Sequence, residues 1–394
     1  MEAVSDVFVL DWVRTPRGKA SAKGGLHHLS ALDLVTGLQD ALVARGLNPD
    51  AVEDLVLGVA SQTGEQGADL ARTANLLAGW PTPGVTLNRF CASGIDAVAT
   101  TAARIRAGDY SLAVAGGVES VSRVPIFSDG GALWADPAVV AAVGSVHMGI
   151  AADLNATREG FTREALDAYA VETHHKAAAA WESGVFDRSV VQLNGLERDE
   201  LVRPGIDAAA LASLPPAFAE RPADDAQVLA RFDAIEHLHT VGTSPQMADG
   251  AALLLLGTRE QADRLGLTPR ARILSSATAT CDPVIMLTAG QEAMETAIAR
   301  AGLTPADIDV FEFAEAFSAL CLRFRRDLDA GPDRMNPHGG TMAMGHAFGA
   351  TGAIMVGGAV DELERREGRY AVAGVSGAAG LGVGLVLERV DEAG

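Results

Sequence analysis

Two side chains in this sequence have the chemistry of covalent catalysis, and each stands just before an apolar helical segment. The first is Cys91, in LNRFCASGIDAV, where small following residues let a substrate carbonyl approach the backbone amides. A thiol at the start of a helix lies at the positive end of the helix dipole, which favours the thiolate. Cys91 is therefore a candidate nucleophile, although a cysteine in an apolar setting is more commonly a structural core residue.

The second candidate is His346, in MNPHGGTMAMGHAFGATGAIMV. The many glycines around it suggest backbone that packs closely against a ligand or another loop. An imidazole there can act as a general base, or donate a hydrogen bond to a developing oxyanion. The alternative is a glycine-rich turn that holds a packed histidine. Nearby His338 is a weaker candidate, which we expect to be a turn residue.

A third feature is the glycine-rich turn in YAVAGVSGAAGLGVGLVLERV. Its amides can line a pocket, but the pattern is also that of an ordinary edge hairpin. The other two cysteines, Cys281 and Cys321, have no local histidine partner and are expected to be structural. The sequence contains no Walker motif, zinc spacing or dinucleotide fingerprint, so we expect no metal and no permanently bound cofactor.

The composition narrows the class of partner and the compartment. A formal net charge of -20 argues against nucleic acid or an anionic membrane surface as the main partner. No apolar run is long enough to predict a membrane span, and the first residues are acidic where a signal peptide is basic. Three scattered cysteines fit a reducing compartment. We expect a cytoplasmic protein.

Short apolar runs alternate with amphipathic stretches along the chain. Residues 7–13, 54–60 and 111–117 are typical of buried strands, and residues 31–46 and 94–108 of helices. This alternation predicts an α/β fold with helices layered on sheets.

The two halves of the sequence echo each other. In the first, a strand leads through a loop to Cys91, a helix and another strand; in the second, residues 307–317 lead to His346, a helix and residues 370–377. Two similar halves facing each other would bring both loops to one site. The expected domains are a first half of residues 1–118 plus 250–270, an inserted loop domain of 119–249, and a second half of 271–394.

Several long motifs in this order and spacing resemble the thiolase family, whose members make or cleave 3-oxoacyl-CoA thioesters. They are VRTPRGK, NRFCASG, AGGVESVSRVP, HMGIAAD, QMADGAA, AGLTPADIDVFEFAEAF and GGTMAMGHAFGATG. The resemblance implies a thiolase fold of two five-layered α-β-α-β-α halves with an inserted loop domain. It also implies a homodimer or homotetramer that uses acyl-CoA and coenzyme A as substrates.

The resemblance carries roles onto individual positions. Cys91 matches the acylated nucleophile, and His346 matches the histidine that activates it. Backbone amides of Cys91 and Ala378, with His346, match the oxyanion holes. The remaining matches concern the acyl, pantetheine and nucleotide contacts: His147, Met148, Arg203, Leu214, Phe218, Ser244 and Phe317.

The departures from the family pattern concern residues that the family uses to make or break the carbon–carbon bond. Counting back from Glu388 without a gap, the family's second cysteine, an acid/base in a CxGxG motif, is Ser376. A hydroxyl is a far poorer proton acceptor than a thiolate. The family's NEAF asparagine, which holds an oxyanion-hole water, is Ala314, and its GHP reads Gly345-His346-Ala347.

The segment near the implied CoA entrance departs as well. Thr243-Ser244-Pro245 replaces the family's usual sequence, so a pantetheine-contacting serine is in doubt, and about 17 extra residues follow the PAF that ends at Phe218. These extra residues form an acidic stretch near 219–239.

Three functions are compatible with these residues. The first is an acyl-CoA C-acyltransferase that forms or cleaves 3-oxoacyl-CoA through an acyl-thioester on Cys91, with Ser376 in place of the second cysteine. The second is a thiolase-fold enzyme with other acyl-thioester chemistry: hydrolysis, acyl transfer or decarboxylative condensation. The third is a partner-dependent subunit that binds acyl-CoA, although a pure binding module needs neither Cys91 nor His346.

Overall fold

The computed structural model describes residues 5–390 and places their strands in one mixed sheet system. The strands are β1 (Phe8–Arg14), β2 (Gly18–Lys19), β3 (Leu55–Gly58), β4 (Gly84–Leu87), β5 (Leu112–Glu119), β6 (Ala248–Gly257), β7 (Ala271–Thr280), β8 (Val310–Phe313), β9 (Tyr370–Gly377) and β10 (Leu381–Arg389). Their order is β4-β3-β5-β6-β1-β7-β10-β9-β8, with β2 paired to β6. Only a short pairing of β1 with β7 joins the N-terminal five strands to the C-terminal four.

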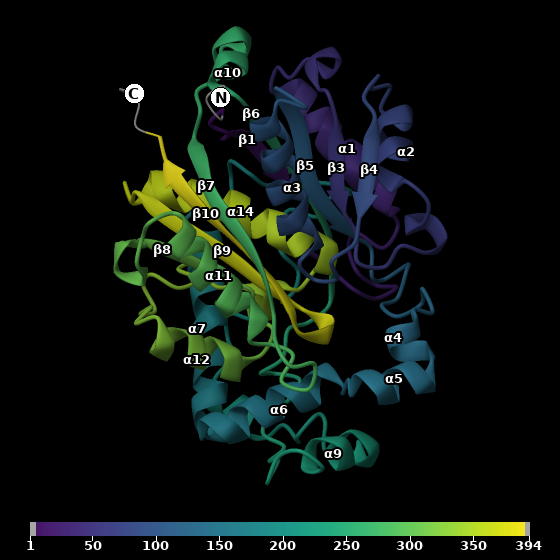
Figure 1. Cartoon of the computed structure of the whole chain (residues 1–394), viewed down its shortest axis with the longest axis vertical. Helices are drawn as coiled ribbons and strands as arrows, with labels where there is room; N and C mark the ends of the chain where they lie inside the picture. Colours follow the sequence, from purple (N-terminus) through teal and green to yellow (C-terminus); the bar gives the residue numbers. More distant parts are fainter. Residues whose placement is uncertain (1–4, 391–394) are drawn as a thin grey trace.

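The helices complete a layered arrangement. The longer ones are α1 (Ala31–Ala44), α2 (Leu70–Leu77), α3 (Ser93–Ala107), α6 (Met148–Glu159), α7 (Arg163–Glu182), α9 (Pro222–Leu229), α11 (Ala289–Arg300), α12 (Ser318–Asp327) and α14 (Phe348–Arg365); the shorter ones are α4 (Ala132–Ala135), α5 (Pro137–Val143), α8 (Ala208–Ala212), α10 (Arg259–Leu265) and α13 (Thr341–Met344). Helices α1 and α2 cover the N-terminal strands and α11 covers the C-terminal ones, while α3 and α14 contact both sets (Figure 1). In the described residues these elements form five layers, α-β-α-β-α, and the expected α/β fold is confirmed.

Helix α14 is buried along most of its length and α3 over its first half, which explains the many small and apolar residues there. Their first turns approach so closely that a Cβ on Gly94 would lie 2.4 Å from the carbonyl oxygen of Gly349. Glycine is required at this crossing because any side chain would meet backbone. The contact brings the N-terminus of α3 and the N-terminus of α14 together.

The region between β5 and β6 carries α4 to α9 and lies at one end of the sheets, near the turn between β9 and β10 (Figure 1). Part of it returns to the N-terminal strands: the Arg14 guanidinium and the Asp199 carboxylate form a buried ion pair with a 2.8 Å contact. The inserted region is therefore fastened to the scaffold as well as covering it.

Residues 137–159 are long and apolar enough, by length and composition alone, to cross a membrane. The structure divides them into α5 and α6 at Gly144, whose left-handed φ of 73° ends α5. Most of α6 is then buried among other parts of the protein. The stretch is thus two short helices with different surroundings.

Candidate active site

Cys91 lies in a tight turn directly before α3. Phe90 has a φ of 49°, a left-handed conformation that a bulky residue rarely adopts, and this reverses the chain ahead of the cysteine. The Ser93 side chain holds the turn, since its Oγ donates to the Phe90 carbonyl at 2.6 Å and accepts from the Arg89 amide at 2.8 Å. The predicted position of Cys91 at the start of a helix is confirmed.

The environment of Cys91 does not favour the thiolate in the resting protein. Only 7% of the residue is exposed. Burial, and next the negative charge of Glu119, raise the pKa of the Cys91 thiol to about 12, although a bond from its own backbone amide acts in the opposite direction. The expectation that the helix dipole would favour the thiolate is wrong here, because desolvation is the larger effect.

His346 is held by its backbone and by one side-chain contact. Its amide donates to the Gln246 carbonyl at 2.7 Å, and its carbonyl accepts from the Ala248 amide at 3.0 Å. The imidazole Nδ1 lies 2.8 Å from the Thr351 hydroxyl, one turn into α14. This contact leaves Nε2 for a substrate or a thiol. Burial, and then the charge of Arg17, lower the pKa of His346 to about 3, so the imidazole is neutral.

The two candidates share a neighbour. Phe348, the first residue of α14, lies 4.4 Å from the His346 ring between centroids, and it also lines a cavity of about 30 Å³ beside Cys91. The other lining residues are mainly apolar: Ala60, Ser61, Phe90, Ile126, Phe127, Asp129, Trp134, Met148 and Ala378. Phe348 is therefore a neighbour of the His346 imidazole and also of the cavity that Cys91 lines.

This cavity adjoins a larger one, of about 260 Å³, which shares Phe127, Trp134, Met148 and Ala378 with it. The larger cavity extends between α5 and the start of α6, and Leu133, Val140, Val146 and Met286 add to its apolar wall. Its other end is polar and comes partly from the acidic insertion, as Arg221 and Asp224.

The insertion is folded rather than loose. Its helix α9 begins beside α6, where the Asp224 carboxylate accepts from the His147 amide at 3.1 Å. After α9 the chain is fastened by buried Asp153, which accepts from the Leu238 and His239 amides. The resemblance placed this stretch near the CoA entrance, and the structure brings its Arg221 and Asp224 to the wall of the larger cavity.

The residues expected to contact CoA divide into three groups. His147, Phe218 and Phe317 form an aromatic cluster, with ring centroids 5.4 Å and 6.0 Å apart, and Met148 next to it lines both cavities. Leu214 packs over Gly242, and the Ser244 hydroxyl donates to the Thr240 carbonyl at 2.7 Å. Arg203 is exposed, and its amide donates to the buried His174 ring.

Ser376 is not brought to Cys91. Its hydroxyl donates to the Leu287 carbonyl at 2.7 Å and accepts from the Gly290 amide at 3.0 Å, so the side chain faces α11 on the outer side of the sheet. The next residue, Gly377, faces inward, because a Cβ there would lie 3.4 Å from the Arg89 carbonyl oxygen. The expected catalytic role of Ser376 is corrected: its hydroxyl fastens β9 to α11.

Ala378 does line the Cys91 cavity. It opens the short turn Ala378–Gly380, so its amide is one of the donors that the start of a helical turn leaves unpaired. Ala314 is buried in the same apolar core cluster as Cys91, and its methyl group offers no polar contact. Among the described residues the site thus has a candidate nucleophile, a candidate base and a candidate amide donor, but no side chain facing Cys91 from the β9–β10 turn that could exchange a proton.

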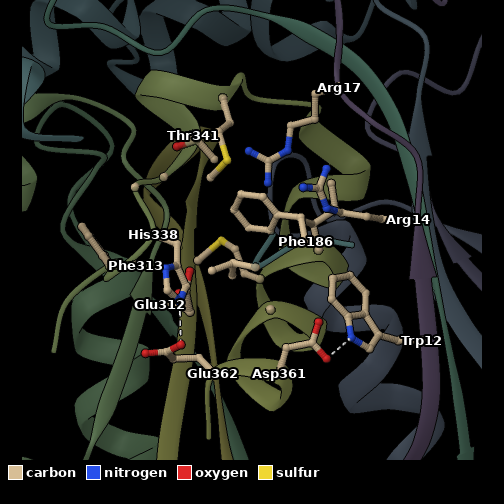
Figure 2. A pocket seen from close by; sticks show the side chains of 17 residues that line it. Trp12, Arg14, Arg17, Phe186, Glu312, Phe313, His338, Thr341, Asp361 and Glu362 are labelled. Atoms are coloured by element: carbon tan, nitrogen blue, oxygen red, sulfur yellow. Dashed lines mark hydrogen bonds and ion pairs between the residues drawn. The ribbon is translucent and has the colours of Figure 1, made fainter. Parts of the chain in front are cut away.

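A separate cavity of about 50 Å³ contains His338. Its ring nitrogen lies 2.5 Å from the Glu362 carboxylate, and Figure 2 shows this pair facing the same space as Arg14 and Arg17. Arg17 is 5% exposed and its guanidinium makes one long bond, 3.4 Å to the Gly345 carbonyl. His338 is thus a partner of Glu362, not a member of the Cys91 site, while Arg17 lies behind His346.

Sequence reasoning missed three residues that shape the site. Glu119 and Arg17 change the protonation of Cys91 and His346 through space, and Trp134 closes the apolar cavity. A charged residue inside an otherwise apolar strand run, as in SLAVAGGVE, was an available signal for Glu119. No local pattern pointed to Trp134.

Comparison with known proteins agrees with the fold. Residues 7–260 match the thiolase N-terminal domain, and residues 267–389 match the thiolase C-terminal domain. A 3-ketoacyl-CoA thiolase of Colwellia psychrerythraea is 35% identical over 98% of this chain and 100% of its own length, and one of Yersinia pestis is 36% identical with the same coverage. The crystal structure of a Bacillus anthracis acetyl-CoA acetyltransferase superposes with a TM-score of 0.85 at 31% identity, covering 99% of this chain and 100% of that one. The chain belongs to the thiolase family.

Proposed function

We propose that this thiolase cleaves or forms 3-oxoacyl-CoA, with Cys91 as the nucleophile that carries the acyl group and His346 as its base. The observation that carries the proposal is that Cys91, just before α3, and Phe348, the first residue of α14, line one apolar cavity, and that the Phe348 ring lies next to the His346 imidazole. The relatives named 3-ketoacyl-CoA thiolase and acetyl-CoA acetyltransferase support the same chemistry. Coenzyme A thioesters are then substrates, and no permanently bound cofactor is required.

The protonation states of the two groups fit a general-base mechanism. Cys91 is a thiol at neutral pH and His346 is a neutral imidazole, so the imidazole can accept the thiol proton as sulfur attacks the carbonyl. In cleavage, the bond between C2 and C3 of the 3-oxoacyl group breaks, and the acetyl-CoA enolate takes the proton that His346 removed from Cys91. Free CoA then gives its thiol proton to His346 as it attacks the thioester, and this proton returns to the Cys91 sulfur as that sulfur leaves.

The assignment of Cys91 and His346 is tested by intact-protein mass spectrometry after mixing with acyl-CoA. We expect one acyl adduct in the wild type, none in Cys91→Ala, and slower formation by roughly 10²–10⁴-fold in His346→Ala, the usual contribution of a general base. An adduct that persists in Cys91→Ala would refute the nucleophile assignment.

The adjoining cavities support an acyl group longer than acetyl. The space beside Cys91 continues into about 260 Å³ lined on one side by Leu133, Val140 and Met286. Burying each extra methylene contributes about 0.8 kcal/mol, or roughly fourfold in kcat/KM, until the apolar wall is covered. We expect kcat/KM to rise from acetoacetyl-CoA to the medium-chain substrates; a maximum at four carbons would contradict this assignment.

One observation favours a second function. Ser376 faces α11 and Ala314 is apolar, so the proton acceptor and the water site that carbon–carbon chemistry uses in the family are both altered. Acyl transfer from Cys91 to water or another nucleophile needs neither group. Comparing the rate of Cys91 acylation with the rate of thiolysis separates the two: fast acylation and hydrolysis without thiolysis would favour the second function.

The edge of the sheet supports the expected self-association. Strand β4 is the edge strand on the N-terminal side of the sheet, and Val85 on it is 41% exposed. Leu76 and Leu77, at the end of the neighbouring α2, are 62% and 66% exposed. An apolar edge strand of this kind pairs readily with another copy. A homodimer through β4, or a homotetramer built from such dimers, in the cytoplasm is the state we propose.

A further inference from the structure

Glu119 is a buried carboxylate that the mechanism above does not use. It lies at the end of β5 with no exposed surface, and four donors satisfy its two oxygens. One oxygen accepts from the Ala60 amide at 2.9 Å and from the Gly349 amide at 3.0 Å. The other accepts from the Ser61 amide at 3.1 Å and from the Gln66 amide group at 2.7 Å. Ion-pairing does not explain its burial, because all four partners are neutral.

Three of these donors belong to the walls of the Cys91 site. Ala60 and Ser61 line the cavity beside the thiol. Gly349 is the second residue of α14, three positions after His346 and directly after Phe348. The single Glu119 carboxylate thus joins the loop on one side of the nucleophile to the helix start that follows the base.

An anionic group at the start of α14 stabilises this helix. The first amides of α14 have no partner within the helix, and a carboxylate there also complements the helix dipole. Phe348 enters the helix with a φ of 30°, so its backbone is strained and depends on its neighbours to stay in place. The position after it has no room for a side chain: a Cβ on Gly349 would lie 2.9 Å from the Glu119 carboxylate.

We propose that Glu119 is a positioning residue for acyl transfer, which holds the Ala60–Ser61 loop and the first turn of α14 in the arrangement that aligns the thiol with the imidazole. The inference rests on the proposed roles of Cys91 and His346. Its negative charge has a second effect, since it disfavours the thiolate of Cys91 and so keeps the empty site unreactive. Removing the Glu119 carboxylate should therefore lower the turnover rate, because the site is misaligned, and raise the rate of Cys91 alkylation, because the opposing charge is gone.

The test compares Glu119→Gln with the wild type in steady-state turnover and in alkylation of Cys91 by iodoacetamide. All four partners of Glu119 donate hydrogen bonds. The NH2 group of the new glutamine is itself a donor, so it cannot accept the bonds from the two donors that face it. The orientation of Gln66 cannot adapt freely, since its oxygen accepts from the Ser120 amide at 2.6 Å. We expect kcat to fall roughly 10–100-fold with little change in KM, the effect of misaligned reacting groups. Alkylation becomes faster, because the charge that opposes the thiolate is gone.

Glu315→Gln is the matched control. Glu315 is equally buried and accepts from Tyr169, Thr173, Asn336 and the Met342 amide, but it touches neither wall of the Cys91 cavity. The Glu315→Gln substitution should lower the melting temperature and leave alkylation of Cys91 at the wild-type rate. If Glu119→Gln behaves like this control, or if its kcat stays within about twofold of the wild type, the proposed positioning role is overturned.

Gln66→Leu keeps the proposal testable should Glu119→Gln not fold. It removes one donor from Glu119 and leaves the negative charge, so kcat should fall without faster alkylation. An unchanged kcat would count against Glu119 as a positioning residue. The acyl adduct on wild-type Cys91 is measured separately, so a failure of the nucleophile assignment is distinguishable from a failure of the role of Glu119.

Discussion

Moving a thiol by one residue along β9 tests which face of this strand meets the nucleophile. The Ser376 hydroxyl bonds to the Leu287 carbonyl and the Gly290 amide on the α11 side. Gly377 faces the turn that carries Cys91, where a Cβ would lie 3.4 Å from the Arg89 carbonyl. Gly377→Cys should therefore place an acid/base thiol at the reacting centre, and Ser376→Cys should not.

The structure sets the size of both effects. Gly377 has an extended backbone with φ of -110°, so a cysteine is not strained, and the tightest contact of its Cβ would be with the end of the Leu381 side chain, at 2.6 Å. The shift of Leu381 costs about 1 kcal/mol. General acid–base catalysis contributes typically 10²–10⁴-fold, so even an imperfectly placed thiol should raise thiolysis by roughly tenfold. Ser376→Cys weakens two hydrogen bonds, at about 1 kcal/mol each, and should lower stability with no gain in rate.

The assay is thiolysis of a 3-oxoacyl-CoA, followed by the loss of its enolate absorbance under reducing conditions that prevent a disulfide with Cys91. Acylation of Cys91 by acyl-CoA is measured alongside and should be similar in all three proteins. A tenfold gain in Ser376→Cys with none in Gly377→Cys would show that the inner face of β9 has been assigned to the wrong residues.

Two further predictions concern stability and assembly. Burial, with the charges of Glu362 and Glu315, raises the pKa of Glu312 to about 8, so the folded protein holds a proton that the unfolded chain releases above its ordinary value of 4.5. The free energy of unfolding should therefore fall by about 2–4 kcal/mol between pH 4.5 and 8. In denaturant titrations, Glu312→Gln should not show this dependence on pH. The same dependence in the variant would contradict the raised pKa of Glu312. Val85→Lys places a charge on the exposed β4 edge and should shift sedimentation toward the monomer, whereas Val43→Lys, at an equally exposed valine on α1, should not.

The elements that hold the two main candidates could be predicted because their signals are local. The small residues after Cys91 and the apolar helix that follows are enough to place the thiol at a helix start. The same holds for His346 and the glycine-rich segment before α14. Strand β3, which leads into the Cys91 loop, and β5, which follows α3, are buried on both faces and appear as apolar runs, which mark them clearly in the sequence.

At Ser376 the sequence alone does not determine which residue of β9 faces the cavity. Alternate residues of a strand face opposite sides, so an uncertainty of one residue exchanges the inner for the outer face. The β9–β10 turn has glycine or alanine at four consecutive positions from Gly377, and small residues of this kind carry little information about which of them faces the cavity. Glu119 and Arg17 were missed for a different reason: their partners lie far away in the chain, and only the packed structure brings them together.

The protonation states of Cys91 and His346 determine which factor limits the rate of Cys91 acylation. Cys91, with a pKa of about 12, and His346, with a pKa of about 3, are both uncharged across the physiological range, so the reactive thiolate forms only during attack. The developing charge is then stabilised by backbone amides in an apolar cavity, where such dipoles act strongly. The rate consequently depends on how well the loops are held and not on a population of free thiolate. We expect acylation of Cys91 to vary by less than about threefold between pH 6 and 8.5, because neither group titrates there. A tenfold rise per pH unit would mean that free thiolate is the attacking species, and would refute the general-base role of His346.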